Sequence, residues 1–250
     1  MATLKSIYRY PVKGLSPESL PAVGLEVGQT LPADRKYAIE NGPSGFDPAA
    51  PAYLPKTRFL MLMRNERLAT LDTHYDDASH VLTIRGEGRK LARGDLATKE
   101  GRLAIEAFFR RFMPKELNGA PKVLEADGHS FSDVSAKVVS IINLASVAAI
   151  ETMVGQPVHP LRFRANLYVE GWPAWSELDW VGQQIAIGDA RVKVTKRIMR
   201  CAATNVDPEI GIRDLQIPAT LMRTFQHADC GIYARVIDGG EIKPGDAINL

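Results

Sequence analysis

Cysteine is scarce in this sequence of 250 residues, in which only Cys201 and Cys230 occur. Two cysteines build neither a disulfide framework nor a four-cysteine zinc site, and no CxxC pair is present. This pattern is typical of proteins in a reducing compartment. A disulfide between the two cysteines stays open, because the sequence does not place the two sulfur atoms relative to each other.

Long apolar runs and an excess of charge are also missing. No stretch approaches the ~18 apolar residues of a membrane span, and residues 1–14 lack the apolar region of a signal peptide. The 31 basic and 29 acidic side chains leave a net charge of +2, which gives no indication of nucleic-acid binding. We therefore expect a soluble cytoplasmic protein that binds neither nucleic acid nor a membrane.

The motifs of several enzyme classes are absent. The five histidines form no i, i+4 pair and no HExxH motif, which argues against a zinc site. No serine lies in a GxSxG motif, so an α/β-hydrolase triad has no support. Gly86-Glu87-Gly88 is only a fragment of a dinucleotide-binding motif, and no helix pattern follows it.

Short strand patterns dominate the sequence. Alternating and β-branched apolar runs predict strands at residues 3–10, 37–39, 58–64, 69–73, 81–85, 138–142, 165–169, 184–187, 190–195, 232–237 and 247–250. Helix patterns are fewer, at 100–113, from the N-cap Asn143 to Gly155, and after Pro218. Many short strands with few helices indicate a mainly β (α+β) fold with a barrel-like domain.

Composition also predicts the domain organisation. The most linker-like stretch is ELNGAP, residues 116–121. We predict a smaller N-terminal β-rich domain over residues 1–110 and a barrel-like domain with a few helices over residues 111–250. Residues 41–55 contain too many glycines and prolines for regular structure, and a loop of this length is typical of functional or mobile segments, such as a lid.

The stretch from Val192 to Gly211 carries the strongest chemical signal. A predicted strand leads into a cluster of cations and then presents Cys201 before small and polar residues. Nearby cations stabilise a thiolate and lower the pKa of the thiol, and the thiolate is the form that attacks electrophiles or binds metals. Cysteine usually packs as a small buried hydrophobic residue, so the motif alone leaves an inert thiol open. We interpret Cys230 as a residue that packs in the core.

Basic side chains also recur at predicted loop edges elsewhere in the chain. They are Lys13, Arg35, Arg162, Arg164 and Arg200. If the fold brings them together, they form a pocket for a phosphate-bearing ligand, because arginine binds phosphate through two parallel hydrogen bonds. Asn166 and Thr204 would add neutral hydrogen bonds there. The alternative is dispersed surface charge, in which each side chain is simply solvated.

These residues lie in ordered motifs that resemble those of MOSC-domain proteins with their N-terminal MOSC barrel domain. The motifs are YPVK (residues 10–13), DR (34–35), RFRAN (162–166), RCAATNVDPEIG (200–211) and GEIKPGD (240–246). The similarity covers almost the whole chain, and the order of the motifs makes it specific. The family includes the mitochondrial amidoxime-reducing component and its bacterial relatives.

The resemblance implies an oxidoreductase that binds the molybdenum cofactor (molybdopterin) and reduces a small-molecule substrate, an N-hydroxylated or N-oxide compound. It implies that Cys201 is catalytic and ligates the molybdenum. The pterin and its phosphate would be bound by Lys13, Arg35, Arg162, Arg164, Asn166, Arg200 and Thr204. A soft thiolate suits a metal–sulfur centre, and cations suit an anionic pterin. Asp207 is interpreted as forming the turn after the ligand, and an acid there could also transfer protons near the metal.

The sequence departs from the family pattern in three respects. The usual segment after the second motif is replaced by the proline-rich loop and residues 54–58, which bears on substrate range and access. Gly14 stands where the family commonly has serine, so one hydroxyl contact to the cofactor is missing. No four-cysteine ferredoxin set is present, so we expect a separate electron-donor protein of the reductase or ferredoxin type. Two other functions stay open: a sulfur carrier with a persulfide on Cys201, and a non-catalytic molybdopterin-binding module.

Overall fold

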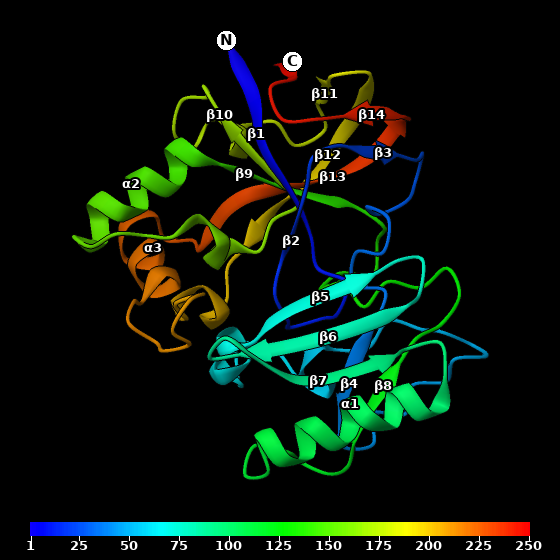
Figure 1. Ribbon diagram of the computed structural model, residues 1–250. Helices are drawn as coiled ribbons and strands as arrows, with labels where there is room; N and C mark the ends of the chain where they lie inside the picture. The colour runs from blue at the N-terminus through cyan, green and yellow to red at the C-terminus, as the bar shows by residue number, and fades with distance from the viewer.

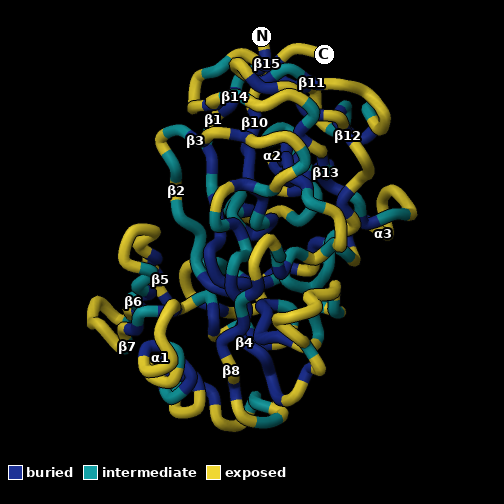
Figure 2. The backbone as a smooth tube through the Cα atoms, turned by 90° about the vertical axis from the view of Figure 1, so that its right-hand side faces the viewer, coloured by how far each residue is buried: buried dark blue, intermediate teal, exposed yellow.

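Most of the regular structure is extended, which confirms the expected mainly β (α+β) fold. The computed structural model describes all residues from 1 to 250 (Figure 1). A barrel lies in the upper part of Figure 1, and a smaller region of strands with one long helix lies below it. Buried residues are concentrated in the strands at the centre of the molecule, and exposed ones in the outer loops (Figure 2).

The largest sheet closes into a barrel. Its strands, in the order in which they pair, are β10 (Leu167–Glu170), β9 (Val139–Asn143), β13 (Asp229–Asp238), β12 (Ala190–Met199), β11 (Gln184–Ile187), β15 (Ala247–Asn249) and β1 (Ala2–Arg9). The ring closes because β1 also pairs with β10. β2 (Glu18–Leu20) is added to β1 outside the ring. Closure leaves the ring without unpaired strand edges.

Alternating apolar residues fill the barrel. In β12, Val192 and Val194 are buried whereas Arg191 and Lys193 are exposed, as the two-residue period of a strand requires. Buried residues from every strand of the ring form one apolar cluster. Full burial of one valine or isoleucine side chain contributes about 1.5–3 kcal/mol to stability. The barrel is therefore a firm support for the loops that leave its strands, including the one that begins with Cys201.

The smaller region combines a meander with a helix. Its elements are β4 (Ala38–Asn41), β5 (Asp72–Asp76), β6 (Val81–Gly86), β7 (Arg89–Asp95), α1 (Lys99–Phe112) and β8 (Pro121–Leu124). The strands β5, β6 and β7 pair in sequence order, and β4 pairs with β8. The helix expected at 100–113 is confirmed, with Ile105 and Phe109 fully buried in the core of this region. Thr98 caps the helix by accepting a hydrogen bond from the Gly101 amide.

Two further helices lie on one side of the barrel (Figure 1). They are α2 (Leu144–Val154) and α3 (Ile217–Phe225). The predicted caps of α2 are confirmed, because the Asn143 side chain accepts from the Ala145 amide and Gly155 adopts a left-handed φ of 69°. The remaining elements are β3 (Val23–Leu25), β14 (Gly240–Ile242) and the 3₁₀ helices η1 (Lys56–Arg58), η2 (Glu66–Thr70), η3 (Pro160–Phe163), η4 (Ser176–Asp179) and η5 (Ala202–Asn205).

The strand expected at 58–64 is wrong. Only Phe59 makes an isolated bridge, to Glu40 of β4, and the chain then turns, since the amides of Arg64 and Asn65 both donate to the Met61 carbonyl. The Asn65 side chain closes this turn by accepting from the Met61 amide. The apolar run is explained by burial of Phe59 and its neighbours without a strand ladder. The sequence analysis also missed β7, whose residues are mostly exposed and show no clear alternation.

The two ends of the chain meet in the barrel (Figure 1). β1 pairs with β15, and β14 pairs with β3. In the smaller region, β8 lies beyond residue 110 and pairs with β4. The division at residues 110 and 111 stays a prediction. None of the helices is both long enough and apolar enough to cross a membrane.

Candidate functional site

A cavity of about 440 Å³ lies where barrel strands meet loops of the smaller region. Its wall includes Cys201 and each cation and polar residue that the sequence analysis assigned to the cofactor: Lys13, Arg35, Arg162, Arg164, Asn166, Arg200 and Thr204. Asp207 does not line this cavity. The dispersed-charge alternative is therefore wrong, although the role of each residue in binding stays a prediction.

Cys201 follows the end of β12 and is partly exposed in the cavity wall. Its carbonyl accepts hydrogen bonds from the amide and the hydroxyl of Thr204, at 3.1 and 3.0 Å, which hold the turn after the cysteine. The Lys56 ammonium lies 3.2 Å from the Cys201 sulfur. Both cysteines are free thiols, and burial raises the pKa of fully buried Cys230 to about 12. Of the two thiols only Cys201 lines the cavity, and its chemical role stays a prediction.

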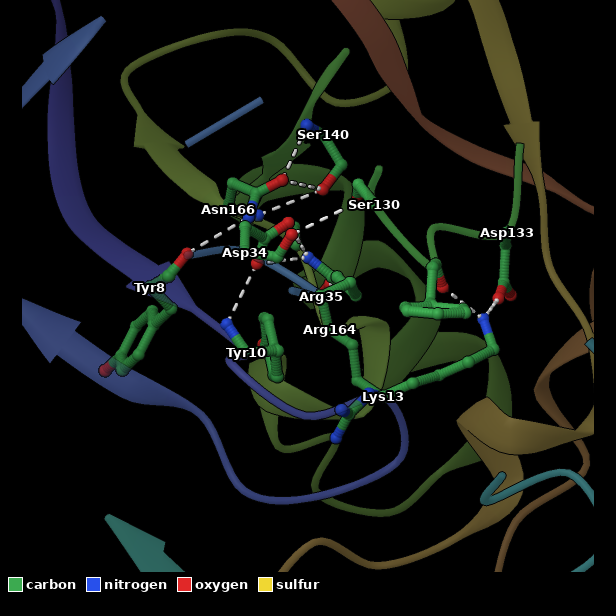
Figure 3. Close-up of polar contacts among 12 residues, drawn as sticks. Tyr8, Tyr10, Lys13, Asp34, Arg35, Ser130, Asp133, Ser140, Arg164 and Asn166 are labelled. Atoms are coloured by element: carbon green, nitrogen blue, oxygen red, sulfur yellow. Dashed lines mark hydrogen bonds and ion pairs between the residues drawn. The ribbon is translucent and has the colours of Figure 1, made fainter. Parts of the chain in front are cut away.

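Lys13 and Lys56 share one carboxylate, that of Asp133. The Lys13 ammonium donates to Asp133 at 2.5 Å and to the Phe131 carbonyl at 2.8 Å, and Lys56 donates to the second Asp133 oxygen at 3.0 Å (Figure 3 shows Lys13 and Asp133). Burial lowers the pKa of Lys13, and Asp133 only partly offsets this effect. Partial burial favours the neutral acid at Asp133, but the two ammonium groups outweigh it and hold the pKa of Asp133 well below its usual range.

Arg35 and Arg164 lie against the ring of Tyr10, each with its guanidinium carbon 4.3 Å from the ring centroid. Asp34 binds Arg35 through both carboxylate oxygens, at 2.7 and 2.6 Å, and Arg35 donates to the Arg164 carbonyl at 2.9 Å. Arg164 donates to the Leu15 carbonyl at 2.7 Å. Figure 3 shows the two arginines side by side next to Tyr10. Cation–π contact and hydrogen bonds thus fix two positive charges at one end of the cavity.

The backbone at both arginines is strained. Arg35 and Arg164 have φ values of 52° and 50°, in the left-handed region that costs a non-glycine residue about 1–3 kcal/mol. Burial lowers the pKa of Arg164, whereas at Arg35 the effect of burial is exceeded by Asp34, so that its pKa is raised. Backbone strain of this kind persists only where the surrounding structure holds the residue in place, and it is frequent at binding and active sites.

Asn166 links the strands behind the two arginines. Its side-chain oxygen accepts from the amide and the hydroxyl of Ser140, at 3.0 and 2.8 Å, and its side-chain nitrogen donates to the Tyr8 carbonyl at 3.2 Å (Figure 3). The side chain is buried, and these bonds connect β9 and β1. Asn166 therefore has a structural task beside the cofactor contact predicted for it.

Arg200 keeps one donor free. Its Nε donates to the Cys230 carbonyl at 2.7 Å and Nη1 to the Phe163 carbonyl at 2.9 Å, while Nη2 is buried without any partner. A buried guanidinium nitrogen without an acceptor is costly, and an anion would relieve that cost. Arg200 belongs to the cavity wall together with Cys201. Arg162 Nε and the Tyr10 hydroxyl are buried without a partner as well, so this donor supports an anionic ligand only together with the other cations of the wall.

Arg162 and Asp207 interact mainly with protein groups. The Arg162 side chain is only 1% exposed and donates to both oxygens of Asp214, each at 2.7 Å, and to Asp207 at 2.9 Å. The other Asp207 oxygen accepts from the amides of Glu209 and Ile210, at 2.9 and 3.0 Å. This is the turn-forming role expected for Asp207. Its charge is paired with Arg162, and its proton-transfer role stays a prediction.

The sequence analysis assigned no role to three charged residues of the site. Asp34 fixes Arg35, while Lys56 and Asp133 lie next to Cys201 and Lys13. Lys56 directly follows the 41–55 segment and begins η1, and a lysine at the start of a 3₁₀ turn has no local signature. Asp133 lies in a loop of small residues. Lys56 and Asp133 are identified only by their contacts with residues far away in the sequence, because neither belongs to a motif.

The backbone conformation explains why glycine occupies position 14. Gly14 has a φ of +83°, and a Cβ atom there would lie 2.8 Å from the Leu60 carbonyl oxygen and 3.3 Å from a Leu68 methyl group. A serine at this position therefore requires the Leu60 backbone to move. The hydroxyl that the family commonly places here does not fit this backbone.

We expect Gly14→Ser to lower the free energy of unfolding by about 3 kcal/mol, because strain at a positive φ and steric overlap add. Urea denaturation measures this change. Gly45→Ser is the matched control, since Gly45 has a φ of +81° but nothing within 4 Å of the new Cβ. The control is expected to lose about 1 kcal/mol from strain alone. Equal losses in the two variants would contradict the role of the Leu60 contact.

The residues of the cavity fit a molybdenum cofactor. Cys201 offers a soft sulfur ligand, which suits a metal centre bound to sulfur. Lys13, Arg35 and Arg164 offer positive charge for an anionic pterin and its phosphate. The unpartnered Nη2 of Arg200 adds a donor that the protein itself does not satisfy. No group of His, Cys, Asp and Glu side chains that could hold a bare metal ion is present in the chain.

Comparison with known proteins finds relatives that carry a common name. The chain is 26% identical over 136 residues to the mitochondrial amidoxime-reducing component 1 of Homo sapiens, covering 50% of this chain and 39% of that protein. It is 30% identical over 122 residues to the mitochondrial amidoxime reducing component 2 of Bos taurus, covering 44% of this chain and 36% of that protein. The chain thus spans less than two-fifths of the length of these relatives.

Similar solved structures were also found. The YUAD protein from Bacillus subtilis has a TM-score of 0.46 and 13% sequence identity, covering 99% of this chain and 93% of that chain. YiiM from Geobacillus stearothermophilus has a TM-score of 0.35 and 23% identity, covering 44% of this chain and 52% of that chain.

Two domain families match the sequence. The MOSC N-terminal beta barrel domain matches residues 1–113. The MOSC domain matches residues 124–249 and contains Cys201 with most of the cations of the cavity. With more than half of its residues matched by the MOSC domain and most of the remainder by the N-terminal beta barrel domain, the chain belongs to the MOSC family.

Proposed function

We propose that this protein binds the molybdenum cofactor through Cys201 and reduces N-hydroxylated or N-oxide compounds. The MOSC family is associated with molybdenum-cofactor binding. The observation that carries the proposal is the single cavity in which a partly exposed thiol lies among several cations. The printed names of the relatives, amidoxime-reducing components, favour reduction of an N-hydroxylated group.

Different residues of the cavity would bind different parts of the cofactor. Cys201 would ligate the metal as a thiolate, and Thr204 would hold the turn that presents the sulfur. Lys13, Arg35 and Arg164 would neutralise the pterin and its phosphate, as charge-assisted hydrogen bonds do for anionic ligands. The bound cofactor would supply two-electron redox chemistry, and a separate donor protein would supply the electrons.

The mouth of the cavity would admit a substrate with apolar parts. Met63 and Met199 belong to its wall, and Met199 is 74% exposed. Methionine side chains are flexible and polarisable, so they pack against ligands of different shapes. An open, adaptable rim is compatible with a range of small N-hydroxylated compounds.

Metal and pterin analysis tests the proposal. We expect the chain purified from a host that makes molybdopterin to carry about one molybdenum and one pterin per chain, because a deep cavity and a thiolate ligand favour retention. Protein from a host without molybdopterin synthesis is the control and should carry neither. Negligible molybdenum in both preparations would contradict the proposal. Bound cofactor without turnover by any electron donor would instead indicate a non-catalytic molybdopterin-binding module.

A further inference from the structure

Asp133 lies between Lys13 and Lys56 and forms an ion pair with each. The proposed function gives no reason for a carboxylate at this position. Lys13 is almost fully buried, with 6% of its side chain exposed, whereas the Asp133 side chain is 44% exposed. One carboxylate oxygen accepts from Lys13 at 2.5 Å and the other from Lys56 at 3.0 Å. A bound phosphate or carboxylate ligand would bridge two ammonium groups in the same way, with one oxygen on each.

The segment that carries Asp133 is weakly attached to the rest of the protein. The amide of Phe131 donates to the Arg35 carbonyl, and strand pairing resumes at Val139 in β9. Between these points, residues 132–138 make no backbone–backbone hydrogen bond. Side-chain contacts hold this segment in place: Asp133 forms ion pairs with the two lysines, and Lys137 donates to the Gln29 side chain at 2.6 Å.

The backbone of the same residue is connected to residues 41–55. The Tyr53 hydroxyl donates to the Asp133 carbonyl at 3.1 Å, and Lys56 lies directly after this loop. Lys56 in turn contacts the Cys201 sulfur. Movement of the backbone at Asp133 would therefore release the Tyr53 contact, and movement of its side chain would release Lys56.

We propose that Asp133 is an internal anion that occupies an oxyanion subsite formed by Lys13 and Lys56, and that a phosphate-type oxyanion of a ligand displaces it. On displacement, the two ammonium groups exchange one carboxylate for the incoming oxyanion, and Asp133 turns to solvent on its weakly attached segment. No covalent bond changes. The inference adds Lys56 to the binding residues and goes beyond the proposed function, because it holds for any oxyanion ligand.

Calorimetric titration tests the displacement. The full chain is produced in a host that does not make molybdopterin and is titrated with inorganic phosphate at constant ionic strength. We expect Asp133→Asn and Asp133→Ala to bind phosphate about tenfold more tightly than the wild type, since the competing charge is gone. We expect Lys56→Gln to bind about fivefold more weakly, since one ammonium group is lost. Phenyl phosphate, titrated in parallel, distinguishes a phosphate ester from the free ion as the preferred source.

Asp127→Asn is the matched control, because Asp127 is exposed, lies in the same connection between β8 and β9 and forms no ion pair or side-chain hydrogen bond. Its phosphate affinity should stay within about twofold of the wild type. Equal or weaker binding by the Asp133 variants would overturn the proposal and indicate that the carboxylate positions the lysines for the ligand.

A crystal structure of the wild type with phosphate provides a second measurement that does not depend on the folding of variants. The expected result is phosphate on Lys13 and Lys56 with Asp133 turned away. Phosphate bound elsewhere, with the contact between Asp133 and Lys13 intact, would overturn the proposal. Neither measurement uses molybdenum, so their failure leaves the proposed function standing, and failure of metal loading leaves this proposal standing.

Discussion

Replacing Cys201 with serine is expected to lower the rate of reduction of an N-hydroxylated compound by more than about a hundredfold. Residues that only orient a metal ligand cost roughly 10–100-fold when they are changed, so loss of the ligand itself should cost more. A serine hydroxyl is a harder and far less acidic donor than a thiol, and it suits a metal–sulfur centre poorly. Steady-state turnover with a chemically reduced electron donor measures the change.

The chain offers its own control for this experiment. Cys230 is fully buried and packs in the apolar cluster beside α2 and α3, away from solvent. Cys230→Ala is therefore expected to keep its turnover within about threefold of the wild type, with only a modest loss of stability. Cys201→Ser protein with undiminished turnover would contradict the assignment of Cys201. A mass increase of one sulfur on Cys201, in protein without turnover, would favour the sulfur-carrier alternative.

Replacing Arg162 with methionine is expected to lower the free energy of unfolding by about 3 kcal/mol. The guanidinium is 1% exposed and bonds to two carboxylates, those of Asp207 and Asp214. Removing it leaves two partly buried negative charges next to each other, and Asp214 also loses the partner that lowers its pKa. The carboxylates are 20% and 29% exposed, so solvent limits the loss to the lower end of the range for buried ion pairs.

Urea denaturation of Arg162→Met and of Arg89→Met separates a buried pair from a surface pair. Arg89 and Glu87 are 80% and 89% exposed and lie 3.6 Å apart, so the control should change stability little. An Arg162→Met protein as stable as this control, but with reduced phosphate binding, would contradict the structural role. It would restore the interpretation of Arg162 as a residue that binds the cofactor.

Local patterns in the sequence determined most of the secondary structure. The caps of α2 at Asn143 and Gly155 follow from side-chain and backbone chemistry that acts within a few residues. The spacing of apolar residues in α1 likewise determines which face is buried. The 58–64 segment was assigned wrongly because its apolar residues are buried in turns, and a short apolar run does not by itself distinguish the two cases.

The ordered motifs also predicted which residues lie together in the cavity. Cys201, Arg200 and Thr204 lie within a few residues of each other, so the sequence alone brings a thiol and a cation together. The same motifs named the other cations that line the cavity. What they could not show is which of those charges is available to a ligand, because that depends on partners elsewhere in the chain.

Only the tertiary structure decided those partnerships. Arg162 is paired with the carboxylates of Asp207 and Asp214, while Arg200 donates only to backbone carbonyls, although both arginines look alike in their motifs. The contact between Lys13 and Asp133 joins residues 120 positions apart. Contacts of this range leave no periodicity or local composition by which to find them, because they arise only when barrel closure brings separate loops to one place.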